Sequence, residues 1–189
     1  MTIRNLSAAI FSALLLTAAC KNKDGKKTTE PETIVATPVP GDTTQQPVAA
    51  DSTGTAATLP HFKMMDEQGR TVALDALKGK KVFVNIWASW CPPCRAEMPS
   101  IQKLSKKTDK NKVAFVLLSV DDDPAAGAGF KKAQKIELPV FFPGEQLPPL
   151  FNVEGIPATF IFDEKGTLIK SMVGMENYDT QEYVDLLEH

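Results

Sequence analysis

The chain has 189 residues, with 21 basic and 23 acidic side chains and a formal net charge of −2. Hydrophobic residues make up 43% and aromatic residues 7%, which suits one soluble domain with additional segments. The charge is nearly balanced and no basic stripe stands out, so the composition argues against a nucleic-acid partner.

Residues 1–19 have the pattern of an export signal. The stretch 8–19 is apolar, but it is shorter than the about 20 residues that a membrane-spanning helix needs. Cys20 follows directly after small residues, which resembles the lipobox of bacterial lipoproteins, where the signal is cut before the cysteine and the thiol carries a lipid anchor. Thr17 stands where that pattern usually has leucine. A plain secretory signal and an uncleaved anchor therefore remain alternatives.

Residues 20–58 are predicted to be a disordered tether. From Lys21 to Thr58 there is no aromatic residue, and the segment is rich in Thr, Pro, Ala and Gln after a basic start, "KNKDGKK". Such a segment cannot bury enough apolar surface to offset the entropy lost on ordering. We expect it to hold a folded domain, residues 59–189, away from a membrane surface.

Within residues 59–189 the pattern alternates between strands and helices. "HFKMMDEQGRTVAL" predicts an N-terminal β-hairpin that turns at Asp66–Gly69. The other expected strands are 81–88, 112–120, 157–162 and 167–173, and the expected helices are 95–110, 123–135 and 178–188. In "DDD" (121–123), Asp123 is expected to be a helix N-cap within a solvated turn. The Pro-rich stretch 138–151 has no periodicity from which to assign an element.

The order of these elements predicts an α/β fold with a central mixed β-sheet flanked by helices. The strand–helix–strand unit should be parallel with a right-handed crossover, and the last two strands should add an antiparallel hairpin. The pattern shows no internal repeat and no second domain.

The motif "CPPC" lies where a buried strand ends and a helix begins. A helix N-terminus stabilises negative charge, so we expect the thiolate of Cys91 to be the nucleophile. Cys94, one turn later, could resolve a mixed disulfide, while Pro92 and Pro93 stiffen the loop. Structural zinc needs four ligands, and His61 and His189 are not placed near the motif. A purely structural disulfide across so short a loop would contribute little stability.

The segments "FVNIWASWCPPCRAEMP", "LDALKGKKVFVNIWASW" and "VEGIPATFIFDEKG" resemble the thioredoxin superfamily. More narrowly, they resemble the membrane-tethered, extracytoplasmic thiol-disulfide oxidoreductases of the ResA/TlpA type. The resemblance implies a thioredoxin-like fold from about residue 60 onward. It also implies a reductant outside the cytoplasmic membrane, and some family members reduce apocytochrome c before haem attachment.

The resemblance assigns roles to further residues. Glu97 matches a buried acid that handles protons at the cysteines, while Asn85 stands where ordinary thioredoxins have an aspartate. The alternative for Glu97 is a solvated helix glutamate. Pro157 matches the cis-proline that faces the cysteines, leaving the backbone of Ile156 free to pair with a client segment. Trp90 is expected to flank the nucleophile as an apolar contact surface, or to serve in packing.

The sequence therefore predicts an exported, lipid-anchored thiol-disulfide oxidoreductase whose Cys91–Cys94 dithiol is its own redox centre, without organic cofactor or metal. Its partners would be client proteins with disulfides or thiols and a transmembrane thiol protein that supplies electrons. A peroxiredoxin-like peroxidase is one alternative, although "NIWASWC" lacks the Thr and Pro that such enzymes place before the cysteine. A copper carrier is another, although the nearby histidine ligand usual in such carriers is missing. Clients and the direction of electron flow stay open.

Overall fold

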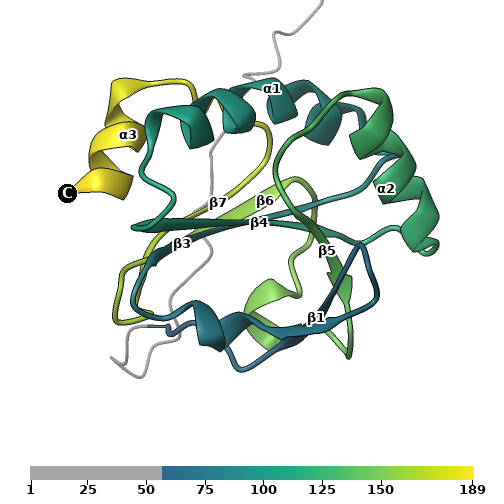
Figure 1. The fold of residues 1–189 in the computed structure, drawn as a ribbon, viewed down its shortest axis with the longest axis horizontal. Helices are drawn as coiled ribbons and strands as arrows, with labels where there is room; N and C mark the ends of the chain where they lie inside the picture. Colours follow the sequence, from purple (N-terminus) through teal and green to yellow (C-terminus); the bar gives the residue numbers. More distant parts are fainter. Residues whose placement is uncertain (1–56) are drawn as a thin grey trace, which may run out of the picture. The chain divides into compact units, whose positions relative to one another are not determined.

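The computed structural model describes residues 57–189, shown in Figure 1. The predicted export signal 1–19, the lipidation site Cys20 and the tether up to residue 56 lie outside the described residues. Just before the predicted domain boundary, Ala57 accepts a hydrogen bond from the backbone of Leu168, and Thr58 forms a β-bridge with Thr167. In this part of the chain no helix has both the length and the apolar character to cross a membrane.

A seven-stranded mixed sheet runs through the domain in the order β2-β1-β5-β4-β3-β6-β7. The strands are β1 Lys63–Asp66, β2 Thr71–Ala73, β3 Lys81–Trp87, β4 Val113–Ser119, β5 Val140–Pro143, β6 Ala158–Phe162 and β7 Leu168–Val173. The pairs β3–β4 and β4–β5 are parallel, whereas every other pair is antiparallel. The predicted mixed sheet with an N-terminal hairpin is confirmed.

Both faces of the central strand β3 are buried, which explains its uninterrupted run of β-forming residues. Because side chains alternate across a strand, Phe83, Asn85 and Trp87 point to one face and their neighbours to the other. The first face is covered by three helices, α1 Pro92–Lys107, α2 Pro124–Ala133 and α3 Gln181–Glu188 (Figure 1). Short 3-10 turns, η1 Leu74–Leu77 and η2 Pro149–Phe151, lie on the opposite face.

Three details differ from the sequence prediction. Strand β5 was not expected, because it has only four residues, the last of them Pro143, and its pairing comes from β1 and β4, which are distant in sequence. Helix α1 begins at Pro92, directly after its N-cap Cys91 as the CPPC motif indicated, but it ends at Lys107 rather than at residue 110. Helix α3 begins at Gln181 rather than residue 178, and Tyr178 is instead a buried loop side chain beneath it.

Candidate active site

The two cysteines of the CPPC motif form a disulfide at the junction of β3 and α1, with their Cα atoms 5.3 Å apart. Cys91 is the N-cap residue of α1, and the backbone N–H of Cys94 donates to Cys91 Sγ at 3.3 Å. The Cys94 N–H and the positive end of the helix dipole both face this sulfur, and both stabilise the negative charge of the thiolate when Cys91 is reduced. Cys94 is fully buried and Cys91 is 3% exposed, while Pro92 and Pro93 are exposed between them.

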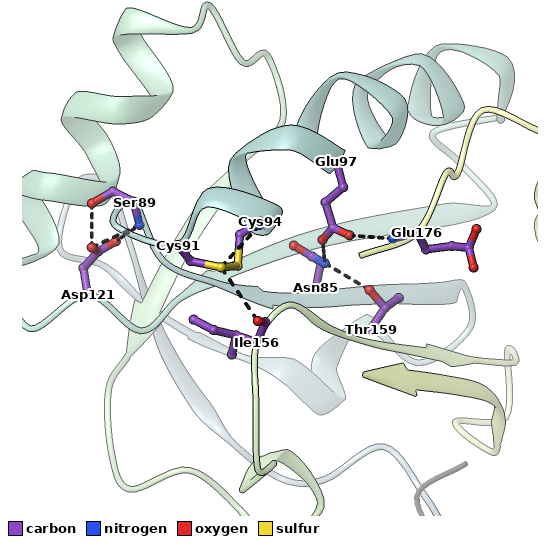
Figure 2. Close-up of a disulfide and its surroundings, with 9 residues drawn as sticks. All are labelled: Asn85, Ser89, Cys91, Cys94, Glu97, Asp121, Ile156, Thr159 and Glu176. Atoms are coloured by element: carbon purple, nitrogen blue, oxygen red, sulfur yellow. Dashed lines mark hydrogen bonds between the residues drawn. A yellow bond between two sulfur atoms is a disulfide. The ribbon is translucent and has the colours of Figure 1, made fainter. Parts of the chain in front are cut away.

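The loop before β6 faces the disulfide. The Ile156–Pro157 peptide bond is cis, as the resemblance implied, and the carbonyl oxygen of Ile156 lies 3.8 Å from Cys91 Sγ (Figure 2). Ile156 is half-buried, and the carbonyl of Pro157 accepts a hydrogen bond from the Gly174 N–H at 2.8 Å. Trp90 is 65% exposed, which leaves the indole free to contact another molecule rather than pack in the core.

Glu97 is buried beneath α1 with 2% of its surface exposed, so it is not a solvated helix residue. One carboxylate oxygen accepts from Asn85 Nδ2 at 2.8 Å and the other from the backbone N–H of Glu176 at 3.2 Å (Figure 2). Burial raises the pKa of Glu97 to about 7, against the lowering effect of these two hydrogen bonds. The carboxyl group can therefore gain or lose a proton near neutral pH, three residues from Cys94 on the same helix.

A chain of polar side chains continues from Glu97 into the core. Asn85 Nδ2 also donates to Thr159 Oγ1 at 3.0 Å, and Thr159 Oγ1 is 2.6 Å from the hydroxyl of Tyr178. Asn85 Oδ1 is buried and has no hydrogen-bond partner among residues 57–189. Sequence reasoning missed Thr159 and Tyr178. The alternation of β3 places Asn85 beneath α1, but only the pairing of Asn85 with Thr159 across β3 and β6 reveals the chain.

A second buried carboxylate lies on the other side of the disulfide. Asp121 accepts from the backbone N–H of Ser89 at 3.0 Å, from the Ser89 hydroxyl at 2.7 Å and from the Ser119 hydroxyl at 2.6 Å. A Cβ at Gly127 would lie 2.7 Å from Ser119 Oγ, so a side chain there would displace the Ser119 hydroxyl from this cluster. The expectation that 121–123 is a solvated turn is thus wrong for Asp121, whereas Asp123 caps α2 as expected.

This cluster fixes the segment that precedes the nucleophile. Ser89 is two residues before Cys91, and the carboxylate ties it to the end of β4 (Figure 2). The run of three aspartates gave no signal of this role, because only the fold brings Asp121 next to Ser89.

The described geometry, a disulfide at a helix N-terminus facing a cis-proline loop, can be compared with known proteins. The family model described as Redoxin matches residues 53–187. The chain belongs to the Redoxin family. It is 31% identical over 124 residues to the thiol-disulfide oxidoreductase ResA of Bacillus cereus, covering 65% of this chain and 72% of that protein. It is 34% identical over 130 residues to the thioredoxin-like protein YneN of Bacillus subtilis, covering 67% and 76%.

A solved structure of a thiol:disulfide interchange protein of the thioredoxin family, from Chlorobium tepidum, superposes with a TM-score of 0.61 at 28% identity. That match covers 73% of this chain and 99% of the other. The fold of this Redoxin family member is therefore thioredoxin-like, as the sequence indicated, and the protein is a thiol-disulfide oxidoreductase.

Proposed function

We propose that the protein is a membrane-tethered, extracytoplasmic reductant of client disulfides. The observation that carries this proposal is the Cys91–Cys94 pair at the N-terminus of α1, beside a buried Glu97 with a pKa of about 7. This arrangement supports the proposal, because it brings together two cysteines and a carboxyl group that can exchange a proton near neutral pH. The dithiol itself carries the electrons, so the proposal needs no further cofactor.

In the proposed reaction, the Cys91 thiolate attacks one sulfur of a client disulfide. A bond forms between Cys91 and that sulfur, and the other client sulfur leaves as a thiolate that takes a proton. Cys94 then loses its proton and attacks Cys91 Sγ, which forms the Cys91–Cys94 disulfide and releases the second client thiolate. Two electrons pass from the dithiol to the client in each turnover.

Glu97 is proposed to take the proton from Cys94. Both groups are buried, so bulk water does not readily reach the thiol, and a carboxylate with a pKa of about 7 is half ionised at neutral pH. The half-buried Ile156 backbone beside the cis-Pro157 would pair with an extended client segment. Trp90, Pro92 and Pro93 provide the exposed surface around the nucleophile.

The location and the partners rest on the sequence. Residues 1–19 have the pattern of an export signal and Cys20 that of a lipidation site, which would place the domain outside the cytoplasmic membrane. A reductant there needs two electrons per turnover from across the membrane, so a transmembrane thiol protein is the proposed donor. Apocytochrome c is a candidate client, because some ResA-type proteins reduce it.

The direction of electron flow is tested by the reduction potential of the Cys91–Cys94 pair, measured by equilibrating the full-length protein with a thiol buffer. A value near that of thioredoxin, about −270 mV, is expected for a reductant. A value near about −120 mV, typical of a strong periplasmic oxidant, would show that the protein oxidises its clients instead.

The anchor is tested separately by expressing the wild-type chain and a Cys20→Ser variant in a bacterial host. The wild type should fractionate with membranes and carry a lipid-sized mass increment on the N-terminal peptide, and the variant should lose that increment. A mature wild-type protein in the soluble fraction that begins after a plain cleavage site would refute the lipoprotein assignment.

A further inference from the structure

A hollow opens between α1 and α2, next to the CPPC motif. It has a volume of about 400 Å³ and is lined by Pro92, Arg95, Ala96, Phe130 and Gln134. A smaller hollow of about 100 Å³ shares Arg95, Phe130 and Gln134 and extends further along α1. The two together form a groove, called here the α1–α2 groove, that starts at the proline following the nucleophile. Of the residues assigned above to client contact, only Pro92 lines this groove.

Arg95 provides the charge of this groove. Its guanidinium lies over the ring of Phe130, 5.4 Å from the ring centroid, and Phe130 is in turn 5.4 Å from the ring of Trp87. The ion pairs found among residues 57–189 all use other cations. A guanidinium stacked on an aromatic ring keeps its edge N–H groups free, and these match a carboxylate in bidentate geometry.

Arg95 is the one charged residue among those that line the groove, and Glu137, which follows the lining residue Ile136, is paired with Lys106. Glu97 is the sole acidic residue of α1 and lies buried on the inner side, while α2 contains no acidic residue and carries Lys131 and Lys132 in its last turn. Asp122 and Asp123 precede α2 but do not line the groove. An anionic group entering from solvent would therefore meet Arg95 without a competing carboxylate on the groove wall.

The groove is close enough to the nucleophile to contact the same client segment. The backbone N–H of Arg95 donates to the carbonyl of Cys91 at 3.1 Å, so the two residues are one helical turn apart. One turn is about 5.4 Å along the helix axis, close to the length of two extended residues. A client side chain about two residues from the attacked cysteine can thus reach Arg95.

We propose that the α1–α2 groove is a specificity site, in which Arg95 on Phe130 binds the carboxylate of an Asp or Glu about two residues from the client's target cysteine. This inference rests on the proposed reduction of client disulfides and names a feature of the preferred clients. It adds no step to the thiol–disulfide exchange, which is balanced as described above.

The test uses quenched fluorescent peptides, each with one disulfide that separates the fluorophore from the quencher when it is reduced. Glu, Gln or Lys is placed two residues before, or two residues after, the target cysteine. Single-turnover rate constants are measured with the reduced full-length protein at about 0.02 M and about 0.5 M salt. In one of the two placements the Glu peptide should react about tenfold faster than the Lys peptide, and high salt should reduce this ratio.

The ratio of the Glu and Lys rates decides the outcome, because changes in intrinsic thiol reactivity cancel in it. Arg95→Met should bring the ratio close to one, Arg95→Glu should invert it and Arg95→Lys should retain part of it. Lys103→Glu is the matched control, since it places the same charge reversal on α1 outside the groove lining. That variant should retain the wild-type ratio.

Equal rates for the Glu and Lys peptides in both placements, or a ratio that Arg95→Met leaves unchanged, would overturn the specificity site while leaving the reductant function intact. Failure of the wild type to reduce any peptide, the Gln peptide included, would instead overturn the proposed function on which the site rests.

Discussion

Two buried carboxylates lie on either side of the disulfide in Figure 2, and they differ in how many donors they have. Glu97, 2% exposed, accepts one hydrogen bond from an amide side chain and one from a backbone N–H. Asp121, 8% exposed, accepts from the Ser89 N–H and from two serine hydroxyls. The two carboxylates are therefore similarly buried but accept hydrogen bonds from different sets of donors.

The two carboxylates also differ in what their surroundings do. For Glu97 the cost of desolvating the charged form exceeds the gain from its two hydrogen bonds, and its pKa rises to about 7. The three donor groups at Asp121 instead connect β4 to the segment before Cys91 and keep that segment in place. We infer that Glu97 takes part in proton transfer, whereas Asp121 holds the segment before Cys91 in position.

The largest effect expected from this comparison is on the rate at which the client is released. Glu97→Gln should slow release of the client from the mixed disulfide at pH 7 by about 100-fold, which is typical of losing a general base. The wild-type rate should rise as the pH passes about 7, because ionised Glu97 is the form that accepts a proton, and the variant should lose this inflection. Stopped-flow single turnovers across the pH range measure both.

The fold should tolerate Glu97→Gln. The unpaired Asn85 Oδ1 can turn toward the new amide and accept its N–H. Glu176→Gln is the control, because only the backbone of Glu176 bonds Glu97, while its side-chain charge slightly raises the pKa of Glu97. That variant should keep the inflection, displaced slightly to lower pH. An unchanged profile in Glu97→Gln would remove Glu97 from the mechanism.

The next effect is on stability. The folded protein raises the pKa of Glu97 from 4.5 to about 7, so it binds this proton more tightly than the unfolded chain does. Its contribution is fully present below about pH 4.5 and is lost as the pH rises to about 7, by about 3 kcal/mol in all. Chemical denaturation of the oxidised wild type and of Glu97→Gln, compared between pH 5 and 8, measures this pH-dependent contribution of Glu97 to the free energy of unfolding. Equal pH dependence in both proteins would contradict it.

The smallest effect concerns Asp121. Asp121→Ala leaves the half-buried Ser89 N–H and two serine hydroxyls without their acceptor and should lower the free energy of unfolding by about 2 kcal/mol. Asp121→Asn should cost less, because the serine hydroxyls can rotate to accept from the new amide. Denaturant titration at pH 7 measures both variants.

Ser119→Ala is the matched control, since it removes a single donor and should cost about 1 kcal/mol. Asp121→Asn should also keep the inflection near pH 7 in the release of the client. Loss of that inflection in Asp121→Asn, with retention in Glu97→Gln, would reverse the roles assigned to the two carboxylates.

Local signals in the sequence predicted much of the site. Cys91 at a strand–helix junction, Pro92 at the first helical position and Asp123 as an N-cap were each readable from neighbouring residues. The buried position of Glu97 and the cis-Pro157 came from the resemblance to a family. Strand β5 could not be predicted, because β1 and β4, which pair with it, are far away along the chain.

The sequence by itself determined the redox motif, the order of the elements other than β5 and therefore the α/β class, because hydrophobic periodicity and helix capping act over a few residues. Only the tertiary structure showed that Glu97 and Asp121 are both buried and that they accept hydrogen bonds from different sets of donors. Thr159 meets Asn85 through the pairing of β3 with β6 and also contacts Tyr178, and Asp121 meets Ser89 where β3 and β4 end side by side. The burial and the hydrogen-bond donors that surround a carboxylate come from segments far apart in the sequence, which no local pattern records.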